Sequence, residues 1–249
     1  QGIINSCCFY KINKVIPSRA FYVDPNGIRN NIFELKDDEF IHAYRVLRLS
    51  KSSEITLLDG MGNAYQGRIK EINQDSIKGI IVNSISNVGE NKIPIEIGIP
   101  IIKINRFEFI IEKATELGVN KFYPILFDRG IKKSINHLRI KKIIKSASKQ
   151  CKRSRFPILC DPKTLVEFLK KTEKLILVGM INSKKKIYDY DLDFNNGVSI
   201  IVGPEGGFSP NEIELMKKYN LNFCNLGKRI LRSETAVLHM LSIINETIF

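Results

Sequence analysis

Two loops of this chain carry residue types that could do chemistry. The first, Gly203–Gly207 (GPEGG), follows the apolar run Ser199–Val202 and precedes a helix start at Ser209. Glycines let backbone N–H groups approach a ligand without hindrance from Cβ atoms, and open α/β sheets bind ligands at the carboxyl ends of their strands. The loop is therefore a candidate ligand site. The alternative is a tight strand-to-helix turn that needs glycine only for its dihedral angles.

The second loop, Leu226–Arg232, joins a short strand to a helix that begins near Ser233. Ser233 suits an N-cap, and Glu234 is favoured by the helix dipole. Capping does not explain why three cations stand beside two large apolar residues in this loop. That mixture suits a ligand with an apolar ring system on one side and a polyanion on the other. Its members are Lys228, Arg229, Ile230, Leu231 and Arg232.

Neither loop has the spacing of the common nucleotide-binding motifs. The chain contains no G-x-x-x-x-G-K-[ST], which excludes a P-loop ATPase. No G-x-G-x-x-G follows the first strand of the α/β part, so the ordinary dinucleotide site is excluded. The usual glycine-rich start of Rossmann-type methyltransferases is excluded for the same reason.

Apolar strand-like runs alternate with helices from Ile93 onward. This alternation indicates an α/β domain with a mostly parallel sheet. Pro210 and the capping box of Ser209 and Glu212 predict a helix over 210–219. The predicted strands are Ile95–Ile102, Lys121–Phe127, Leu175–Val178, Val198–Val202 and Phe223–Leu226. The other predicted helices are Arg106–Leu117, His137–Gln150 and Ser233–Ile248. One more helix is predicted to begin at Asp161, with Pro162 at its first position.

The residues before Ile93 form a different, strand-rich block. A helix is predicted over Asp37–Leu49 with Asp37 as its cap, and the polar stretch Asn83–Lys92 reads as a linker. We therefore expect an N-terminal extension (1–18), a small module (19–88) and an α/β domain (89–249). The predicted strands of the module are Arg19–Val23, Glu54–Asp59, Ala64–Ile72 and Ser76–Ser84.

The chain carries 39 Lys and Arg against 26 Asp and Glu, a formal net charge of +13. Such an excess points to a polyanion, nucleic acid first and an anionic membrane second. Most of it lies in residues 89–249, where Arg129–Arg155 holds 11 basic residues and no acidic one. This run suits a phosphate-facing patch, and a solvated helix face is the alternative.

The cysteines and histidines suggest no metal or disulfide framework. The five cysteines are irregularly spaced, no Cys-x-x-Cys pair exists, and the three histidines are scattered. No apolar run reaches the roughly 18 residues that span a bilayer, and the N-terminus shows no secretory signal. We therefore expect a cytoplasmic protein that holds no metal ion.

Three further motifs accompany the two loops: His42–Arg48 (HAYRVLR), Glu112–Val119 (EKATELGV) and Ala147–Pro157 (ASKQCKRSRFP). Together with Gly203–Ser209 and Leu226–Ala236, they resemble the 16S ribosomal RNA uridine-N3 methyltransferase family of the SPOUT (knotted) methyltransferases. The resemblance runs from about Arg19 to the C-terminus. It is specific, because all five motifs occur in the family's order.

The resemblance implies a PUA-like β-barrel followed by an α/β domain whose C-terminal segment forms a deep trefoil knot. It implies a homodimer that binds S-adenosylmethionine in the knot. The implied substrate is a uridine near the 3′ end of 16S RNA, in the decoding region of the small subunit. No local pattern predicts a knot. Ser233 departs from the family's frequent Thr, and Lys149 departs from its usual Glu.

Carried over residue by residue, the resemblance places the cofactor between the two loops and the end of a strand. Main-chain groups near Leu226, Gly227 and Leu231 would hold the adenine and ribose, while Ile230 and Leu231 would pack on the ring. The implied cofactor-binding residues are Val178, Gly179, Gly203, Pro204, Glu205, Gly206, Gly207, Leu226, Gly227, Ile230 and Leu231, with Met180 beside the strand end.

Methyl transfer from a sulfonium to uridine N3 needs no metal, but it needs aligned reactants and a deprotonated N3. Arg229 or Arg232 could stabilise the charge that develops on the uracil. Glu205 or Glu234 could be the base. A loop-tying carboxylate and a helix-start charge are the alternatives for these two residues, so the base stays unassigned.

A uridine inside folded RNA must be extruded to reach such a pocket. Two other interpretations stay open: a knotted methyltransferase that modifies transfer RNA or another ribosomal base, and a non-catalytic RNA-binding assembly factor. The intact glycine loops argue against the latter. Membrane binding ranks last, because the basic helix Lys141–Lys152 lacks a bulky aromatic face. The candidate phosphate contacts are Arg19, Arg45, Arg48, Arg129, Lys149, Arg153 and Arg155.

Overall fold

The computed structural model describes residues 19–131, 134–190 and 193–248, which fall into two compact units. Unit 1 contains the described residues up to Glu90 together with Ser148–Phe156, and unit 2 contains those of 91–147 and 157–249. The first boundary lies close to the expected one at residue 88. The return of Ser148–Phe156 to unit 1 differs from the expected division. The extension expected at 1–18 lies outside the described residues.

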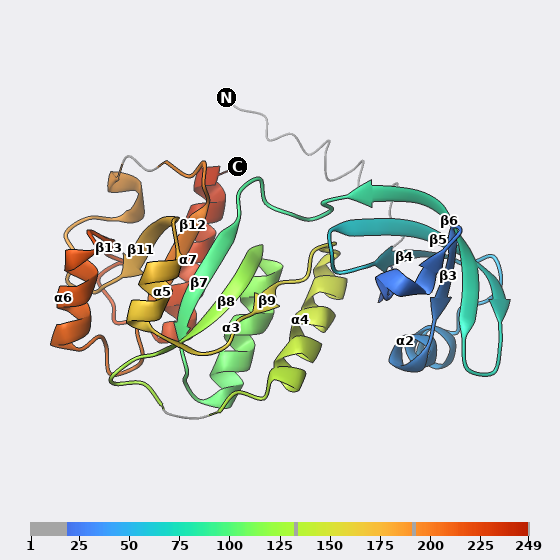
Figure 1. Ribbon diagram of the computed structural model, residues 1–249, viewed down its shortest axis with the longest axis horizontal. Helices are drawn as coiled ribbons and strands as arrows, with labels where there is room; N and C mark the ends of the chain where they lie inside the picture. Colours follow the sequence, from blue (N-terminus) through green and yellow to red (C-terminus); the bar gives the residue numbers. More distant parts are fainter. Residues whose placement is uncertain (1–18, 132–133, 191–192, 249) are drawn as a thin grey trace. The chain divides into compact units, whose positions relative to one another are not determined.

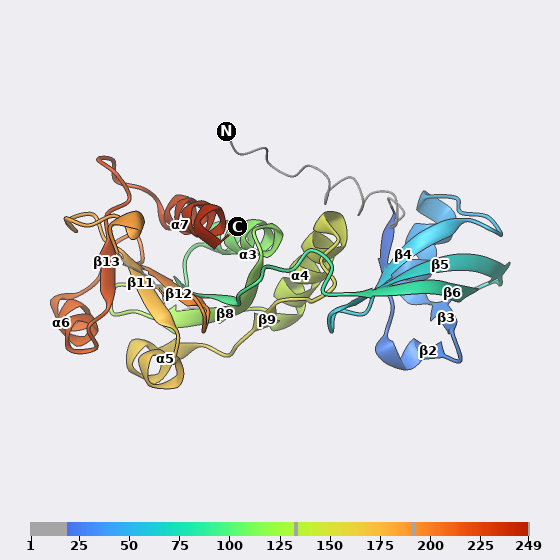
Figure 2. The ribbon, with the colours of Figure 1, turned by 90° about the horizontal axis from the view of Figure 1, so that it is seen from above.

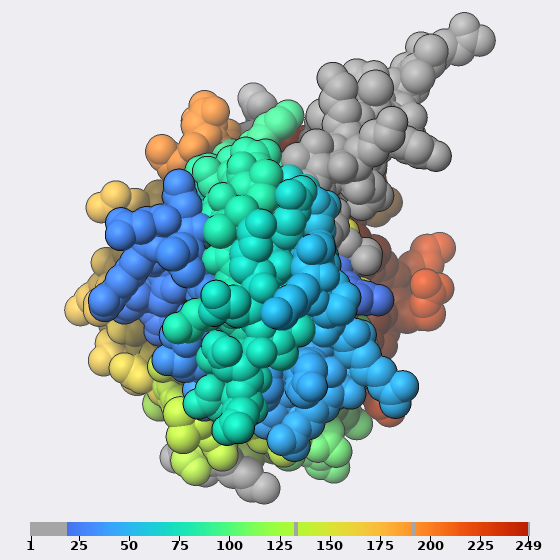
Figure 3. All heavy atoms as spheres, turned by 90° about the vertical axis from the view of Figure 1, so that its right-hand side faces the viewer, coloured from blue at the N-terminus to red at the C-terminus, as the bar shows by residue number. Residues whose placement is uncertain are grey.

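Unit 1 is built on a six-stranded sheet in the order β1-β4-β5-β6-β3-β2. β1 and β4 pair in parallel, whereas the other neighbours pair antiparallel. Figure 3 shows the surface of unit 1, where the teal β6 segment separates the dark blue β2–β3 segment from lighter blue residues. The strands are β1 (Ala20–Tyr22), β2 (Ile28–Arg29), β3 (Ile32–Leu35), β4 (Glu54–Leu58), β5 (Asn63–Ile72) and β6 (Ile77–Ser86).

The helical part of unit 1 only partly matches the predicted helix Asp37–Leu49. The α-helix α2 (Asp37–Ile41) passes directly into a π-helix, η2 (His42–Val46). Lys36 rather than Asp37 is the N-cap, and its side chain makes no capping hydrogen bond. The chain leaves η2 at Arg48, whose φ of 50° is left-handed. Phe40 and Ala43 still point into the unit 1 core, as the apolar spacing predicts.

A buried ion pair ties the segment Ser148–Phe156 to unit 1. Arg153 Nη2 donates to Glu90 Oε2 at 2.7 Å, and the Arg153 side chain is 2% exposed. The Ser154 N–H donates to the Val88 carbonyl at 2.9 Å, and the Gly62 N–H donates to the Ser154 carbonyl at 3.0 Å. The basic run read from the sequence as a phosphate-facing patch therefore supplies part of a domain core.

Unit 2 contains a parallel sheet in the order β10-β8-β7-β12-β11-β13, with β9 paired to β8. The central strands β7 and β12 are buried along their whole length, as apolar runs of a covered parallel sheet should be. Figure 1 shows β7 beside β8 in this sheet. The strands are β7 (Ile95–Pro100), β8 (Val119–Leu126), β9 (Ile158–Leu159), β10 (Lys163–Thr164), β11 (Leu175–Gly179), β12 (Val198–Val202) and β13 (Asn222–Cys224).

Helices cover both faces of the unit 2 sheet. Figure 2 shows α3 and α7 on one face and α5 and α6 on the other. Phe168 of α5 and Met216 of α6 pack with Val178 and Ile201 of the sheet. Among the described residues, none of the helices has the length and apolar character that a bilayer crossing requires. The helices are α3 (Ile104–Glu116), α4 (His137–Cys151), α5 (Leu165–Lys171), α6 (Pro210–Lys218) and α7 (Ser233–Ile248).

The predicted helix start at Asp161 and Pro162 is wrong. Lys163–Thr164 pair with β8 as the short strand β10, so the chain is still extended there. The helix α5 begins after Thr164, whose side chain forms a capping box with Glu167. Strand pairing with a distant segment therefore overrides the preference of proline for a first helical turn.

The variant Glu90→Gln tests the ion pair of the returning segment. It leaves the buried Arg153 guanidinium without its carboxylate, so we expect unit 1 to lose about 3 kcal/mol of unfolding free energy. Urea denaturation measures this loss. The control is Glu54→Gln, which removes the exposed partner of Arg68 and should leave the midpoint close to wild type. Equal losses in both variants would contradict the role of the buried pair.

Candidate active site

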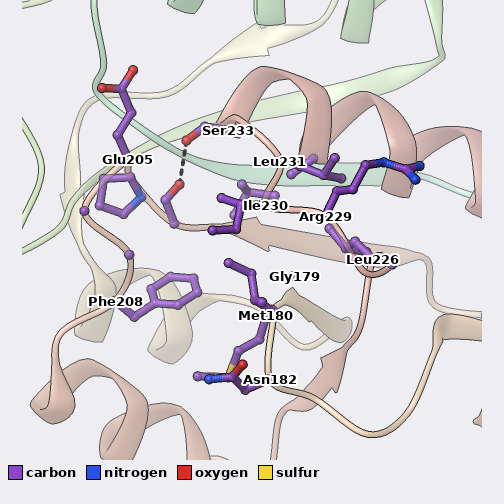
Figure 4. A pocket seen from close by; sticks show the side chains of 18 of the residues that line it. Gly179, Met180, Asn182, Glu205, Phe208, Leu226, Arg229, Ile230, Leu231 and Ser233 are labelled. Atoms are coloured by element: carbon purple, nitrogen blue, oxygen red, sulfur yellow. Dashed lines mark hydrogen bonds between the residues drawn. The ribbon is translucent and has the colours of Figure 1, made fainter.

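A cavity of about 400 Å³ lies where β11, β12 and β13 end in unit 2 (Figure 4). The residues at these strand ends meet because β11 pairs in parallel with both neighbours, so that Gly179 lies opposite Val202 and Cys224. Three loops, the first turn of α7 and one residue of α6 form the walls of the cavity. They are Gly179–Asn182, Val202–Phe208 and Leu226–Leu231 without Lys228, with Ser233 and Ala236 from α7 and Ile213 from α6.

The structure brings the expected cofactor residues together around this cavity, with one exception. Val178 does not line the cavity, because its side chain is fully buried in the core that the sheet forms with α5 and α6. Sequence reasoning missed several further wall residues. The residues of the expected set that line the cavity are Gly179, Gly203, Pro204, Glu205, Gly206, Gly207, Leu226, Gly227, Ile230 and Leu231, with Met180 beside them, and the missed ones include Ile181, Asn182 and Phe208.

The loop Gly203–Gly207 is shaped by groups on both of its sides. Gly207 has a φ of 69°, a left-handed value that favours glycine. Arg129 Nη1 donates to the Gly206 carbonyl at 3.0 Å. After the loop, the predicted capping box of α6 is confirmed, since the Glu212 N–H donates to Ser209 Oγ at 3.2 Å. Arg129, which the sequence predicted as a contact to RNA phosphate, therefore holds this loop in the structure.

Ser233 does not cap α7. Its hydroxyl donates to the Gly203 carbonyl at 2.8 Å, the contact drawn as a dashed line in Figure 4. Ser233 already belongs to the helix, and the Ala236 N–H donates to the Arg232 carbonyl at 2.9 Å. The hydroxyl therefore joins the two cavity loops to each other, which explains why a serine suits a position where threonine would also serve.

Arg106, in the first turn of α3, joins the first loop to the start of α7. Its Nη1 donates to Glu205 Oε1, and its Nε lies 3.6 Å from Glu234 Oε1. The Glu234 side chain is 13% exposed, and its Oε2 is buried with no hydrogen-bond partner among the described residues. A buried carboxylate is costly without a cation, so Arg106 stabilises this junction. Sequence reasoning missed Arg106 because its partners lie far along the chain.

Asn225 organises the other side of the cavity. Its side-chain amide donates to the Ser183 carbonyl at 2.7 Å and to the Ile181 carbonyl at 3.2 Å. Its Oδ1 accepts a hydrogen bond from the Gly227 N–H at 2.7 Å. One side chain therefore couples the loop after β11 to the loop after β13. The only signal in the sequence is an Asn two positions before a Gly, which is typical of a local turn.

The expected catalytic residues have different positions. Arg229 lines the cavity, whereas Arg232 is exposed and does not. Glu234 lies outside the cavity wall and ion-pairs with Arg106. Glu205 does line it, but Figure 4 shows its carboxylate pointing away from Met180 and Phe208. Of the expected pair of cations, the structure brings only Arg229 to the cavity.

The expected phosphate contacts also separate into exposed and engaged side chains. Lys149 Nζ donates to Glu39 Oε1 at 2.8 Å, and this lysine is only 19% exposed. Arg153 is buried against Glu90, so the phosphate contact expected of it is incompatible with its position. The exposed members of the set are Arg19, Arg45, Arg48, Arg129 and Arg155.

Two thiols of the described residues are poor nucleophiles. Burial raises the pKa of Cys224, beside the cavity, to about 12. Burial also raises the pKa of Cys160. Both thiols therefore stay protonated at neutral pH. Within the described part of the chain, no group of three or more His, Cys, Asp or Glu side chains is placed to hold a metal ion.

Comparison with known proteins identifies the two units. Residues 89–245 match an RNA methyltransferase domain, and residues 35–82 match an RNA methyltransferase PUA domain. A ribosomal RNA small subunit methyltransferase E from Synechocystis is 31% identical over 90% of this chain and 76% of its own length. The chain belongs to this methyltransferase family. A member from Rickettsia conorii is 29% identical over 87% of this chain and 91% of its own length.

Solved structures of the family have the same architecture. The enzyme from Neisseria gonorrhoeae, bound to S-adenosyl methionine, aligns with a TM-score of 0.84 and 28% identity over 93% of this chain and 98% of that one. A probable rRNA-methyltransferase from Porphyromonas gingivalis aligns with a TM-score of 0.84 and 26% identity over 92% and 98%. The expected family is therefore confirmed, as are a PUA-like first part and an α/β methyltransferase part with a parallel sheet.

Arg106→Ala tests the junction between the first loop and α7. Without the guanidinium, Glu205 and Glu234 lose their partner, and we expect amides of residues 203–209 to exchange hydrogen about tenfold or more faster. Hydrogen-exchange mass spectrometry measures this rate. Arg139→Ala is the matched control, because Arg139 pairs with Glu108 on the same helix α3. Unchanged exchange in Arg106→Ala would show that the loop does not depend on this residue.

Proposed function

We propose that this chain transfers a methyl group from S-adenosylmethionine to N3 of a uridine in 16S ribosomal RNA. The observation that carries the proposal is the cavity at the ends of β11, β12 and β13, whose loops lie within the residues 89–245 that match the family. Relatives over most of the chain are named for methylating small-subunit ribosomal RNA. The choice of uridine and of its N3 atom rests on the resemblance of the loops Gly203–Ser209 and Leu226–Ala236.

The cavity suits a nucleoside-sized methyl donor. Its volume of about 400 Å³ lies within the range of about 300–1,000 Å³ that small-molecule sites occupy. Leu226, Ile230 and Leu231 give it an apolar wall, and the glycines of the first loop expose backbone groups on the other side. S-adenosylmethionine supplies, when bound, an activated methyl group on a sulfonium. A related structure was solved with this molecule bound.

Arg229 is the residue best placed to stabilise the reacting uracil. It lines the cavity, but Figure 4 shows its guanidinium directed away from Met180 and Phe208, so its side chain must turn inward to face the negative charge that develops as N3 loses its proton. Glu205 and Glu234 are both engaged by Arg106, which favours loop-tying roles over proton abstraction for both. The base therefore stays unassigned between these carboxylates and another group.

The resemblance supports further features of the proposal. They are a trefoil knot formed by the C-terminal part of unit 2, closure of the unit 1 sheet into a PUA-like barrel, a homodimer, and action in the cytoplasm on the small subunit. The exposed residues Arg19, Arg45, Arg48 and Arg155 of unit 1 and Arg129 of unit 2 are the proposed phosphate contacts. Neutralisation of phosphates by such residues makes RNA affinity fall steeply with salt.

Mass spectrometry of 16S RNA tests the reaction. The protein is incubated with S-adenosylmethionine and either naked 16S RNA or small subunits, and we expect one N3-methyluridine per RNA in one of the two substrates. Transfer RNA is the control substrate and should stay unmodified. Methylation of transfer RNA or of a different base would replace the proposed substrate. Failure to bind S-adenosylmethionine in calorimetry would instead favour a non-catalytic assembly factor.

Arg229→Ala tests the stabilising cation. At saturating cofactor and RNA, we expect its single-turnover methylation rate to fall about 100-fold, the size of loss seen when one charge-stabilising donor is removed. Arg232→Ala should keep most of the rate, because this side chain does not line the cavity. A wild-type rate in Arg229→Ala would remove the residue from the mechanism.

A further inference from the structure

A lysine-rich segment adjoins the cavity on its β11 side. Met180, Ile181 and Asn182 line the cavity, and the chain then continues through Ser183 into Lys184–Lys186 and the short 3-10 helix η3 (Ile187–Asp189). We call residues 183–190 the lysine segment. It was not singled out in the sequence, since it lies outside the basic run Arg129–Arg155 and outside the family motifs.

The lysine segment is held in place by hydrogen bonds to β13 and to Asn225, which follows β13. Ser183 Oγ and Tyr190 Oη both donate to the Phe223 carbonyl, at 2.5 and 2.8 Å. The Asn225 N–H donates to the Lys185 carbonyl at 2.7 Å. Ile187 is buried and anchors η3. The backbone of the lysine segment is thus attached to β13 at both of its ends. The exposed side chains of the segment therefore project from an ordered backbone.

The exposed side chains of the segment are basic and aromatic. Lys184, Lys185 and Lys186 are all exposed, and Tyr188 is 63% exposed. Lys185 Nζ lies 4.6 Å from the Tyr190 ring centroid, and Lys186 Nζ lies 5.3 Å from that of Tyr188. Cations alternating with aromatic rings are typical of surfaces that bind single-stranded nucleic acid, where lysines meet phosphates and rings stack on bases.

The cations of this side form no ion pair with a carboxylate of the described part of the chain, although Asp189 interacts electrostatically with Lys186. Lys184, Lys185 and Lys186 have no ion pair there, and neither has Lys228 of the neighbouring loop. Asp189 is the one carboxylate of the lysine segment, and its Oδ2 accepts a hydrogen bond from the backbone N–H of Lys186. Asn225 bonds to both loops, so the backbones that carry these lysines are joined beside the cavity.

We propose that the lysine segment binds the RNA strand next to the nucleotide that enters the cavity. Lys184–Lys186 contact its phosphates and Tyr188 stacks on one of its bases. This inference rests on the proposed function, since it makes the strand part of the methylation substrate. An extruded nucleotide draws its neighbours to the rim of the pocket, and the lysine segment is the rim that directly continues from the cavity residues Met180–Asn182.

The triple variant K184Q/K185Q/K186Q tests the phosphate contacts. Binding of fluorescently labelled, in vitro-transcribed 16S RNA is measured from 0.05 to 0.3 M salt. We expect affinity to fall at least tenfold at the lowest salt, and the slope of log K against log salt to shrink by about 2, since each phosphate contact on a single strand contributes about 0.7. S-adenosylmethionine binding, measured by calorimetry, should match that of wild type.

The matched control is K170Q/K217Q/K218Q, which removes the same charge from the C-terminal ends of α5 and α6. These helices return the chain to the opposite edge of the sheet, so we expect the control to keep RNA affinity and slope. Equal losses in both triple variants would overturn the proposal, as would wild-type affinity and slope in the lysine-segment variant. Tyr188→Ala should lose about fivefold in affinity and Tyr188→Phe should not, because stacking needs only the ring.

Two further outcomes separate this inference from the proposed function. If wild type fails to bind S-adenosylmethionine or to methylate 16S RNA, the proposed function fails, while the two triple variants still decide whether the lysine segment binds RNA. If the lysine-segment variant loses binding to vesicles containing phosphatidylserine but keeps RNA affinity, the segment is a membrane contact and the inference is overturned.

Discussion

The structure of the site depends on one constraint, the parallel pairing of β11 with β12 on one side and β13 on the other. Parallel neighbours end at the same edge of a sheet, so three chain segments that are far apart in sequence must turn within a small space there. Gly179 stands at the level of Val202 and Cys224, and the cavity opens directly beyond these residues. The position of the cavity is therefore set by the edge of the sheet, and the loops supply the residues that line it.

Long-range polar contacts then fix the loops to each other. Ser233 bonds to the Gly203 carbonyl, Asn225 bonds to the loops on both sides of it, and Arg106 joins two glutamates. Ser233 and Asn225 satisfy backbone groups of these loops. Arg106 pairs with the carboxylates of Glu205 and Glu234. The same contacts leave the cavity itself lined mainly by glycine and apolar side chains, which is a suitable environment for a ring system.

The basic excess of the chain has two distinct uses. Arg153 and Lys149 neutralise carboxylates inside unit 1, although their part of the sequence contains no acidic residue. Arg106 does the same in unit 2. The cations that form no ion pair among the described residues include Arg229 at the cavity and the lysines of the lysine segment. Net charge therefore indicated a polyanion as the class of partner, but the pairing of each cation decides whether it is available to such a partner.

The sequence was most informative where a signal is local. The buried strands, the capping box of α6 and the glycine loops were all predictable from spacing and composition. Arg106 and Glu205 are 99 positions apart, and Arg153 and Glu90 are 63 apart, so neither pair leaves a local pattern. The start of α5 was misjudged for the same reason, because pairing with β8 keeps Lys163–Thr164 extended. The strands β2 and β3 are too short for alternation to reveal them.

The return of Ser148–Phe156 to unit 1 has a consequence for how the two units could be separated or exchanged. Unit 1 is discontinuous, since it includes a piece of chain that begins in the last turn of α4. A single proteolytic cut near residue 90 would not release it intact, because Ser148–Phe156 would stay covalently attached to unit 2 at both of its ends. A gene fusion that transfers only the first 90 codons would likewise leave Glu90 without Arg153. The two units are therefore inherited together, because the chain crosses between them three times.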